Sequence, residues 1–362
     1  MAMFTLTNKI AVERCQALFS TIKASYNFPN VNREKSRTQL EAHLKAKLLE
    51  VAYISDFQGA GKSTLMEMAA NTLKFLKEPT AMVRAKDVSP ERLTEDLRNF
   101  GALFVDDADI RTSWRKIVDG LRSLQDFASE HPCPIVVCGD FTLRNEELRE
   151  VFGSLPQREI KMEAVDRQFF LEALNHRLRY LFPDSKDEIL SDGNYIFDDD
   201  LLRCLVPDSA IPVATFREVL SLSEGISNVV EPTDEEFRLT REHAEIYCQE
   251  RPLSGPSNQQ QWSFLKLWLK PFVTQVHPLG SGMEPFDTNR VLNEVKIDGI
   301  DDAEALLKDV LEPLAAGGFL HALGVPSFQD GEFNRYPSPF LPRPTFLLHA
   351  YAGGEDWPPE DE

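Results

Sequence analysis

Cysteine is scarce in this sequence, and the cysteines present are not arranged for cross-linking or metal binding. The chain has five, scattered and odd in number, with no Cys-x-x-Cys pair. This pattern supports neither a disulfide framework nor a zinc cluster, and it is typical of a reducing compartment. The amino terminus also lacks the basic and then apolar segment of a secretion signal. We therefore expect a cytoplasmic protein.

A long apolar run and an excess of positive charge are missing as well. The most apolar stretch, residues 262–273, carries two lysines and a proline. It is shorter than the roughly 20 residues that cross a bilayer, so we expect no membrane segment. Asp and Glu together number 58 and Lys and Arg 39, which leaves a net charge of -19. Phosphate backbones repel a chain this acidic, so contact with nucleic acid is expected to be weak or indirect.

What the sequence does contain is an ordinary globular composition and a regular alternation of elements. A length of 362 residues with 42% apolar side chains predicts two or three domains. Alternating strands and helices favour a parallel α/β sheet covered on both faces, with ligands at the carboxyl ends of its strands. The predicted strands are five short apolar runs over residues 48–57, 80–88, 101–110, 134–141 and 158–165.

A glycine-rich stretch follows the first predicted strand and opens a helix. Residues 55–73 read SDFQGAGKSTLMEMAANTL, and the standard phosphate-binding loop reads Gly, four residues, then Gly-Lys-Ser/Thr. Gly61, Lys62 and Ser63 fit this pattern, but Asp56 stands where the first glycine belongs. Aspartate tolerates turn conformations, although its carboxylate would repel a phosphate. Because the strand and the helix are the setting that such a loop requires, we predict a nucleotide site.

The parts of this loop have separate expected roles. Backbone N–H groups at the start of the helix attract phosphate. Lys62 reaches the β- and γ-phosphates, and Ser63 offers its hydroxyl to Mg²⁺. The predicted nucleotide-binding residues of the loop are Gly59, Ala60, Gly61, Lys62, Ser63 and Thr64.

A second motif, ALFVDDAD at residues 102–109, places carboxylates at the end of a predicted strand. We expect this strand to lie beside the strand that precedes the loop, where a carboxylate holds magnesium. Asp106 takes that role, with Ser63 as the other metal residue. Asp107 stands where many ATPases have a glutamate that polarises the attacking water. Aspartate is one methylene shorter, so we expect slow hydrolysis.

Both motifs, with the segment VNREKSRTQLEAHLKAKLLEVAYISDFQGAGKSTL from residue 31, resemble the AAA+ class of P-loop ATPases. Within it, the chain is similar to the branch that contains origin-initiator and STAND switch ATPases. The resemblance implies a nucleotide core over residues 1–165 and a helical lid over residues 166–230. It also implies that Asn32 and Arg33 lie near the adenine, and that ATP and Mg²⁺ are the cofactors.

The same resemblance implies further groups around the phosphates. Arg217, in the lid segment VATFREVLSLSEGISN, matches the second sensor by position. A planar, permanently charged arginine fork suits phosphate oxygens, and the candidates for a finger given to a neighbouring subunit are Arg144, Arg149 and Arg158. The first sensor departs from the family pattern, with Cys138 and Asp140 on its strand and Thr142 and Asn145 as substitutes.

The last third of the chain changes in character. We predict a linker over residues 231–255, a winged-helix-like α+β domain over residues 256–350 and an acidic tail over residues 351–362. Helical segments precede FLHALGV (319–325) and RPTFLLHAYA (343–352), which we interpret as the strands of a β-ribbon. The helix that would enter a DNA groove, residues 301–314, is acidic with one lysine. Base reading needs Arg, Asn, Gln or Lys, so we favour a protein partner for this domain.

Together these features predict a magnesium-dependent ATP-binding switch with slow hydrolysis. It would form a homo-oligomer and engage a partner protein or nucleoprotein complex, in a setting such as replication, transposition or antiphage defence. Two alternatives stay open. One is a non-catalytic adaptor that carries a nucleotide. The other is an ATP-dependent, DNA-binding initiator or loader. In that alternative a patch such as Arg335, Arg343 and His349 would contact the phosphate backbone of DNA.

Replacing Lys62 with alanine is expected to abolish tight ATP binding, because no other residue of the loop supplies a cation. Isothermal titration calorimetry of variant and wild type measures this. Asp56→Gly is the companion change: it removes a negative charge near the phosphates, so ATP binding should stay intact or strengthen. Equal ATP affinity in Lys62→Ala and wild type would contradict the nucleotide site.

Overall fold

The computed structural model describes most of the chain in two compact units. We call residues 32–163 with 325–334 the sheet unit, and residues 1–31, 164–324 and 335–362 the helical unit. Among the described residues, no helix is long and apolar enough to cross a membrane. The described residues are 18–19, 33–56, 60–75, 80–89, 101–108, 114–130, 133–140, 143, 155–162, 165–181, 196–208, 215–230, 238–253, 256–324, 328–329, 332–333 and 339–353.

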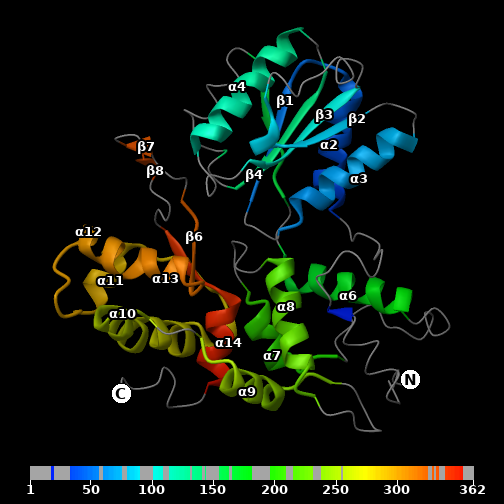
Figure 1. Ribbon diagram of the computed structural model, residues 1–362. Coiled ribbons are helices and arrows are strands. Elements are labelled where there is room, and N and C mark those ends of the chain that lie inside the picture. Colours follow the sequence, from blue (N-terminus) through cyan, green and yellow to red (C-terminus); the bar gives the residue numbers. More distant parts are fainter. Residues whose placement is uncertain are drawn as a thin grey trace. The chain divides into compact units, whose positions relative to one another are not determined.

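The sheet unit contains five parallel strands in the order β2-β3-β4-β1-β5 (Figure 1). Apolar clusters lie on both faces of the sheet, one packed by α2 and α3 and the other by α4. This confirms the predicted parallel α/β sheet. The elements are β1 (Val51–Ser55), β2 (Thr80–Arg84), β3 (Ala102–Ala108), β4 (Ile135–Gly139), β5 (Gln157–Glu159), α2 (Glu34–Ala46), α3 (Lys62–Phe75), α4 (Trp114–Glu130) and the short 3₁₀ helix η1 (Ala85–Asp87).

The strand order corrects one expectation. The strand of the second motif, β3, does not lie beside β1, because β4 pairs with both and separates them. All five residues of β4 are buried, as expected for an apolar strand in the middle of a parallel sheet. The strand signal alone could not reveal this order, since every central strand of such a sheet reads as the same apolar run.

A β-bulge near the end of β3 sets the direction of the second motif. Val105 pairs with Val137 and Ala108 pairs with Gly139, so β3 contains one residue more than β4 over this interval. Asp107, inside the bulge, has a φ of 57°, which is uncommon for a residue other than glycine. A Cβ on Gly139 would lie 2.3 Å from the carbonyl oxygen of Ala108. Glycine therefore allows β4 to approach the bulge, and the bulge re-aims the strand-end carboxylates.

Four helices form the first part of the helical unit. They are α6 (Arg167–Leu181), α7 (Asp199–Leu205), α8 (Phe216–Ser227) and α9 (Arg241–Glu250). Their apolar faces meet in one cluster that also contains Leu18 and Phe19 from the amino-terminal part. The helix predicted from residue 166 onward is thus present as α6. The division at residues 165, 230 and 255 stays a prediction.

The carboxyl-terminal part of the helical unit has the predicted winged-helix-like arrangement, in which helices precede a two-stranded antiparallel ribbon. The ribbon pairs β6 (Leu320–Ala322) with β9 (Phe340–Pro342). A second antiparallel pair, β7 (Phe328–Gln329) with β8 (Glu332–Phe333), belongs to the sheet unit. The helices are α10 (Gln259–Phe264), α11 (Thr288–Glu294), α12 (Ala303–Leu306), α13 (Glu312–Ala316) and α14 (Pro344–Ala352), with π-helical turns at Leu265–Leu269, Phe272–Val276 and Leu307–Leu311 and a 3₁₀ turn at Pro278–Gly280.

One strand assignment in this part is wrong. Residues 344–352 form helix α14, with Arg343 as its N-cap, and the second strand of the ribbon is the preceding segment Phe340–Pro342. Pro344 is the first residue of the helix, where its fixed φ and missing N–H are tolerated. The run after it is apolar without alternation and is buried on nearly all sides. A fully buried helix and a buried strand have the same apolar pattern over so short a stretch.

Gly139→Ala is expected to lower the free energy of unfolding by about 1–3 kcal/mol, because a methyl group forced against backbone displaces neighbouring atoms. Urea titration measures the change. Gly282→Ala is the control: its Cβ would meet nothing within 4 Å, although its φ of +63° is also unfavourable for alanine. If both variants lost the same free energy of unfolding, the close approach of β4 to the bulge would not explain the loss in Gly139→Ala.

Candidate functional site

The predicted phosphate loop joins β1 to α3 (Figure 1). Lys62 is the first residue of α3 and is only 8% exposed. Its Nζ donates a hydrogen bond to the carbonyl oxygen of Asp56, 2.7 Å away. Gly61 has a φ of +92°, a conformation that glycine adopts without penalty. The lysine head group and the first turn of α3 thus lie together, and a helix amino terminus attracts anions. Gly59 lies outside the described residues.

The geometry at Asp56 explains how the loop forms without its first glycine. Asp56 is not among the described residues with positive φ, so its backbone conformation is open to any amino acid. Two contacts of Asp56 at the loop come from its backbone. Its N–H donates to Gly139 O at 3.3 Å, and its carbonyl accepts from Lys62. A glycine is therefore not required at this position.

Ser63 and Asp106 meet, although they lie on different elements and β4 separates their strands. Ser63 Oγ donates to Asp106 Oδ1 at 3.1 Å, and the same oxygen accepts the backbone N–H of Asp107 at 2.9 Å. One hydroxyl and one carboxylate suit Mg²⁺, which keeps several waters and is bound through one or two carboxylates plus phosphates. In the described part of the chain, His, Cys, Asp and Glu form no group of three or more that could hold a metal by itself.

The side chain of Asp107 lies against Arg84 and not against Ser63. Its side chain is 58% exposed, and its Oδ2 lies 3.7 Å from the Nε of Arg84 at the end of β2. The left-handed backbone at the bulge separates its direction from that of Asp106. Arg84 was not identified from the sequence, where a lone arginine within a predicted strand carries no signal. The role of Asp107 in polarising water stays a prediction.

Arg33 lies against the phosphate loop. Its guanidinium donates to the carbonyl oxygen of Ala60, and two of its nitrogens lie 3.9 Å from the point that a Cβ on Gly61 would occupy. Arg33 precedes α2 as its N-cap residue. This contact brings a second cation to the loop, in addition to Lys62. The location of Arg33 near the adenine stays a prediction. Asn32, expected near the same base, lies outside the described residues.

The candidate finger Arg158 lies at the amino end of the sheet, whereas the loop follows the carboxyl end of β1. Its Nε is 3.6 Å from Glu50 Oε1, and Glu50 directly precedes β1. The other oxygen of Glu50 is 3.2 Å from Nδ1 of the buried His43, whose Nε2 lies 3.2 Å from Ile135 O. An action of Arg158 on a neighbouring subunit stays a prediction. Arg144 and Arg149 lie outside the described residues.

Arg217 is exposed in the first turn of α8, in the helical unit. A positive side chain is unfavourable there, because the amino end of a helix already carries partial positive charge. This position gives the helix no stability, but it is well suited to meeting an anion. Cys138 is buried in β4 and Asp140 follows that strand, while Thr142 and Asn145 are not described.

Arg33→Ala should weaken ATP and GTP binding by the same factor, about tenfold or more, since a hydrogen bond from a charged group contributes about 1.5–3 kcal/mol. Equal losses are expected because the contact is with the loop and not with the base. Arg37→Ala, one turn later on α2 and paired with Glu41, is the matched control and should bind both nucleotides normally. A loss confined to ATP would place Arg33 at the adenine instead.

No protein-family model matches the sequence, and no curated protein matches it. Similar solved structures include Drosophila ORC bound to DNA, with 12% identity, a TM-score of 0.46 and coverage of 97% of this chain and 95% of that chain. A Thermotoga maritima RuvB mutant has 15% identity and a TM-score of 0.42, covering 81% and 90%. The Aeropyrum pernix ORC1 protein in complex with DNA has 12% and 0.41, covering 94% and 97%.

These identities and TM-scores are too low to carry an argument about function. The arrangement of the chain itself, a five-stranded parallel sheet with a glycine-rich loop between β1 and α3, confirms the predicted fold class. The protein has the α/β fold of a P-loop NTPase.

Proposed function

We propose that the protein is a magnesium-dependent ATP-binding switch that hydrolyses ATP slowly. The observation that carries this proposal is the contact of Ser63 with Asp106, next to the buried Lys62 at the start of α3. Two motifs that are 43 residues apart converge there. A chance glycine-rich turn would give no reason for a strand-end carboxylate to meet its serine.

The residues of this site divide into those that bind the phosphates and those that bind Mg²⁺. Lys62 and the N–H groups of the first turn of α3 bind the phosphates, and Arg33 holds the loop through Ala60. Ser63 and Asp106 hold Mg²⁺, which when bound neutralises charge on the phosphate oxygens. The hydrogen bond between Ser63 and Asp106 keeps both oxygen ligands close together.

Slow hydrolysis is supported by the direction of Asp107. Its carboxylate lies against Arg84 on the edge strand and is more than half exposed. Polarising a water requires a base within hydrogen-bond reach of that water, so Asp107 must rotate away from Arg84 before it can act. The same observation favours the second candidate, an adaptor that carries a nucleotide without hydrolysing it.

Assembly and partner binding complete the proposal. We infer a homo-oligomer in which one of Arg144, Arg149 and Arg158 serves the neighbouring site, with Arg217 acting from the lid of the same chain. The domain over residues 256–350 docks a protein, and any nucleic-acid contact is weak or indirect. Exposed acidic side chains around α12 support this docking, namely Asp301, Asp302, Glu304 and Asp309.

Asp106→Ala and Asp107→Ala are expected to separate binding from turnover. Asp106→Ala removes a magnesium ligand, so ATP affinity should lose its dependence on Mg²⁺. Asp107→Ala should bind ATP normally and release phosphate more slowly, since removing a positioned base typically costs about 10²–10⁴-fold. Calorimetry with and without Mg²⁺ and a phosphate-release assay measure the two effects.

Asp119→Ala is the control, because Asp119 is an exposed carboxylate on α4 that belongs to neither motif and lies 3.9 Å from Arg122 of the same helix. Phosphate release by Asp107→Ala at the wild-type rate would remove Asp107 from the mechanism. A wild type that binds ATP with Mg²⁺ but releases no phosphate would establish the adaptor in place of the ATPase.

A further inference from the structure

The first turn of α8 holds three consecutive residues with different environments. Phe216 packs against α6, Arg217 is exposed and Glu218 is buried. Thr215 caps the helix, and its hydroxyl accepts the backbone N–H of Glu218 at 3.2 Å. The proposed nucleotide-contacting residue Arg217 therefore stands between a partly buried phenylalanine and a buried glutamate on one turn.

Phe216 fixes this turn to the helices of the lid. Its ring lies 6.0 Å from that of Phe169 and 5.9 Å from that of Phe170, both in edge-on geometry. The guanidinium of Arg177 covers it at 5.3 Å from the ring centre, an arrangement that attracts a cation to an aromatic face. Burial lowers the pKa of Arg177 to about 10.

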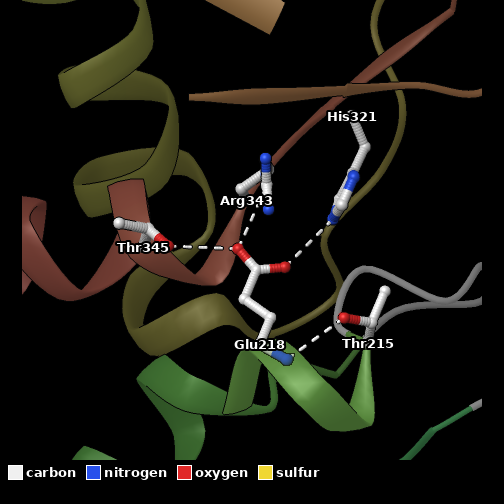
Figure 2. Close-up of polar contacts among 5 residues, drawn as sticks. All are labelled: Thr215, Glu218, His321, Arg343 and Thr345. Atoms are coloured by element: carbon white, nitrogen blue, oxygen red, sulfur yellow. Dashed lines mark hydrogen bonds and ion pairs between the residues drawn. The ribbon is translucent and has the colours of Figure 1, made fainter. Parts of the chain in front are cut away.

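Glu218 fixes the same turn to the carboxyl-terminal part of the helical unit. Figure 2 shows its carboxylate between three side chains of that part. Oε1 accepts from Arg343 Nε at 3.0 Å and from Thr345 Oγ1 at 3.1 Å. Oε2 lies 3.5 Å from Nε2 of His321. His321 belongs to β6, Arg343 follows β9 and Thr345 belongs to α14, so one carboxylate joins both strands of the ribbon and the final helix.

The local sequence favours a different use of this glutamate. Thr-Phe-Arg-Glu at residues 215–218 matches a capping box, in which the glutamate turns back to the N-cap N–H. Thr215 makes its half of the box, but the Glu218 carboxylate reaches Arg343 instead. Burial on its own raises the pKa of Glu218, yet the bonds from His321 and Arg343 hold that pKa below its usual range. The side chain is therefore ionised in the helical unit.

A buried carboxylate is a costly way to gain stability. Removing a charge from water is expensive, and well-packed apolar residues often stabilise a protein as well or better than a buried ion pair. A buried ion pair does impose one geometry, because either partner left alone would be strongly destabilising. Arg343 is itself held, since its backbone N–H donates to Phe319 O at 2.9 Å. The cluster thus sets the angle at which the ribbon and α14 meet α8.

We propose that Glu218 is a positioning residue that links Arg217 to the ribbon β6–β9 and to α14. This inference rests on the proposed function, in which Arg217 meets the phosphates. A shift of Arg217 on nucleotide binding moves α8, and the cluster carries that shift to the part that docks the partner. Since coupling between two sites is reciprocal, partner binding at the carboxyl-terminal part equally favours one position of Arg217.

The test is a double-mutant cycle on phosphate release by the full chain. In the wild-type background, Arg217→Ala is expected to lower the rate about tenfold. In the Glu218→Gln background, where Arg217 is no longer positioned, the same change should cost less than about twofold, because contacting residues that act together are not additive. Glu224→Gln is the matched control, a half-buried carboxylate on the same helix whose side chain makes no hydrogen bond or ion pair with the ribbon within the described part of the chain. In this background the full effect of Arg217→Ala should remain.

Three further variants distinguish a loss of coupling from misfolding. Thr345→Val removes one hydrogen bond to Glu218 and should give a partial loss of coupling, and Arg343→Lys retains the charge and should restore part of it relative to Arg343→Met. Hydrogen exchange of residues 320–322 and 340–352 is measured with and without ATP. The expected result is an ATP-dependent change in the wild type that is absent in Glu218→Gln.

Three outcomes would overturn the inference. Multiplicative effects of Arg217→Ala and Glu218→Gln would give Glu218 a purely structural role. An ATP-dependent change in exchange that persists in Glu218→Gln would show that the cluster does not carry the signal. If Arg217→Ala alone had no effect, the inference would fall while the phosphate site stood. The proposed function itself falls only if Lys62→Ala binds ATP like the wild type.

Discussion

The hydroxyl of Ser63 and the carboxylate of Asp106 come together from opposite sides of β4, and the candidate site depends on this contact. Two features make it possible. The bulge in β3 turns the carboxylates at the strand end, and Gly139 leaves room for the backbone of Ala108. The predicted magnesium position is therefore a consequence of sheet geometry as much as of the two motifs.

Cationic side chains gather around the loop, although the protein as a whole is acidic. Lys62 donates to the backbone of Asp56, Arg33 donates to Ala60, and Arg84 faces Asp107. Two cations therefore contact the loop itself, which suits an anionic ligand, while the third contacts the exposed aspartate at the end of β3. This distribution favours a site that binds nucleotide more readily than it hydrolyses it.

In the helical unit, both apolar packing and a polar cluster join the helices to the carboxyl-terminal part. Helix α14 contributes Leu348 to the cluster of α6 to α9 and Phe346 to the cluster of the carboxyl-terminal part, so apolar contact alone already joins the two clusters. Apolar contact is non-directional. The cluster of Glu218, Arg343, Thr345 and His321 adds direction (Figure 2), because hydrogen bonds require an aligned donor and acceptor. That directional link is what a switch requires between its nucleotide and its partner.

The sequence by itself determined the features that depend on near neighbours: the strand, loop and helix around Lys62, the apolar run ending in Asp106, and the helix from residue 166, all set by periodicity and turn chemistry. Tertiary structure alone decided which strands are adjacent, because buried strands carry the same apolar signal whatever their neighbours. It also decided that residues 343–352 form a helix, that Arg33 contacts the loop, and that Glu218 leaves its capping box for Arg343. The contacts of Arg33 and Glu218 are with partners 27 and 125 residues away, and no local pattern encodes which distant partner a side chain will meet.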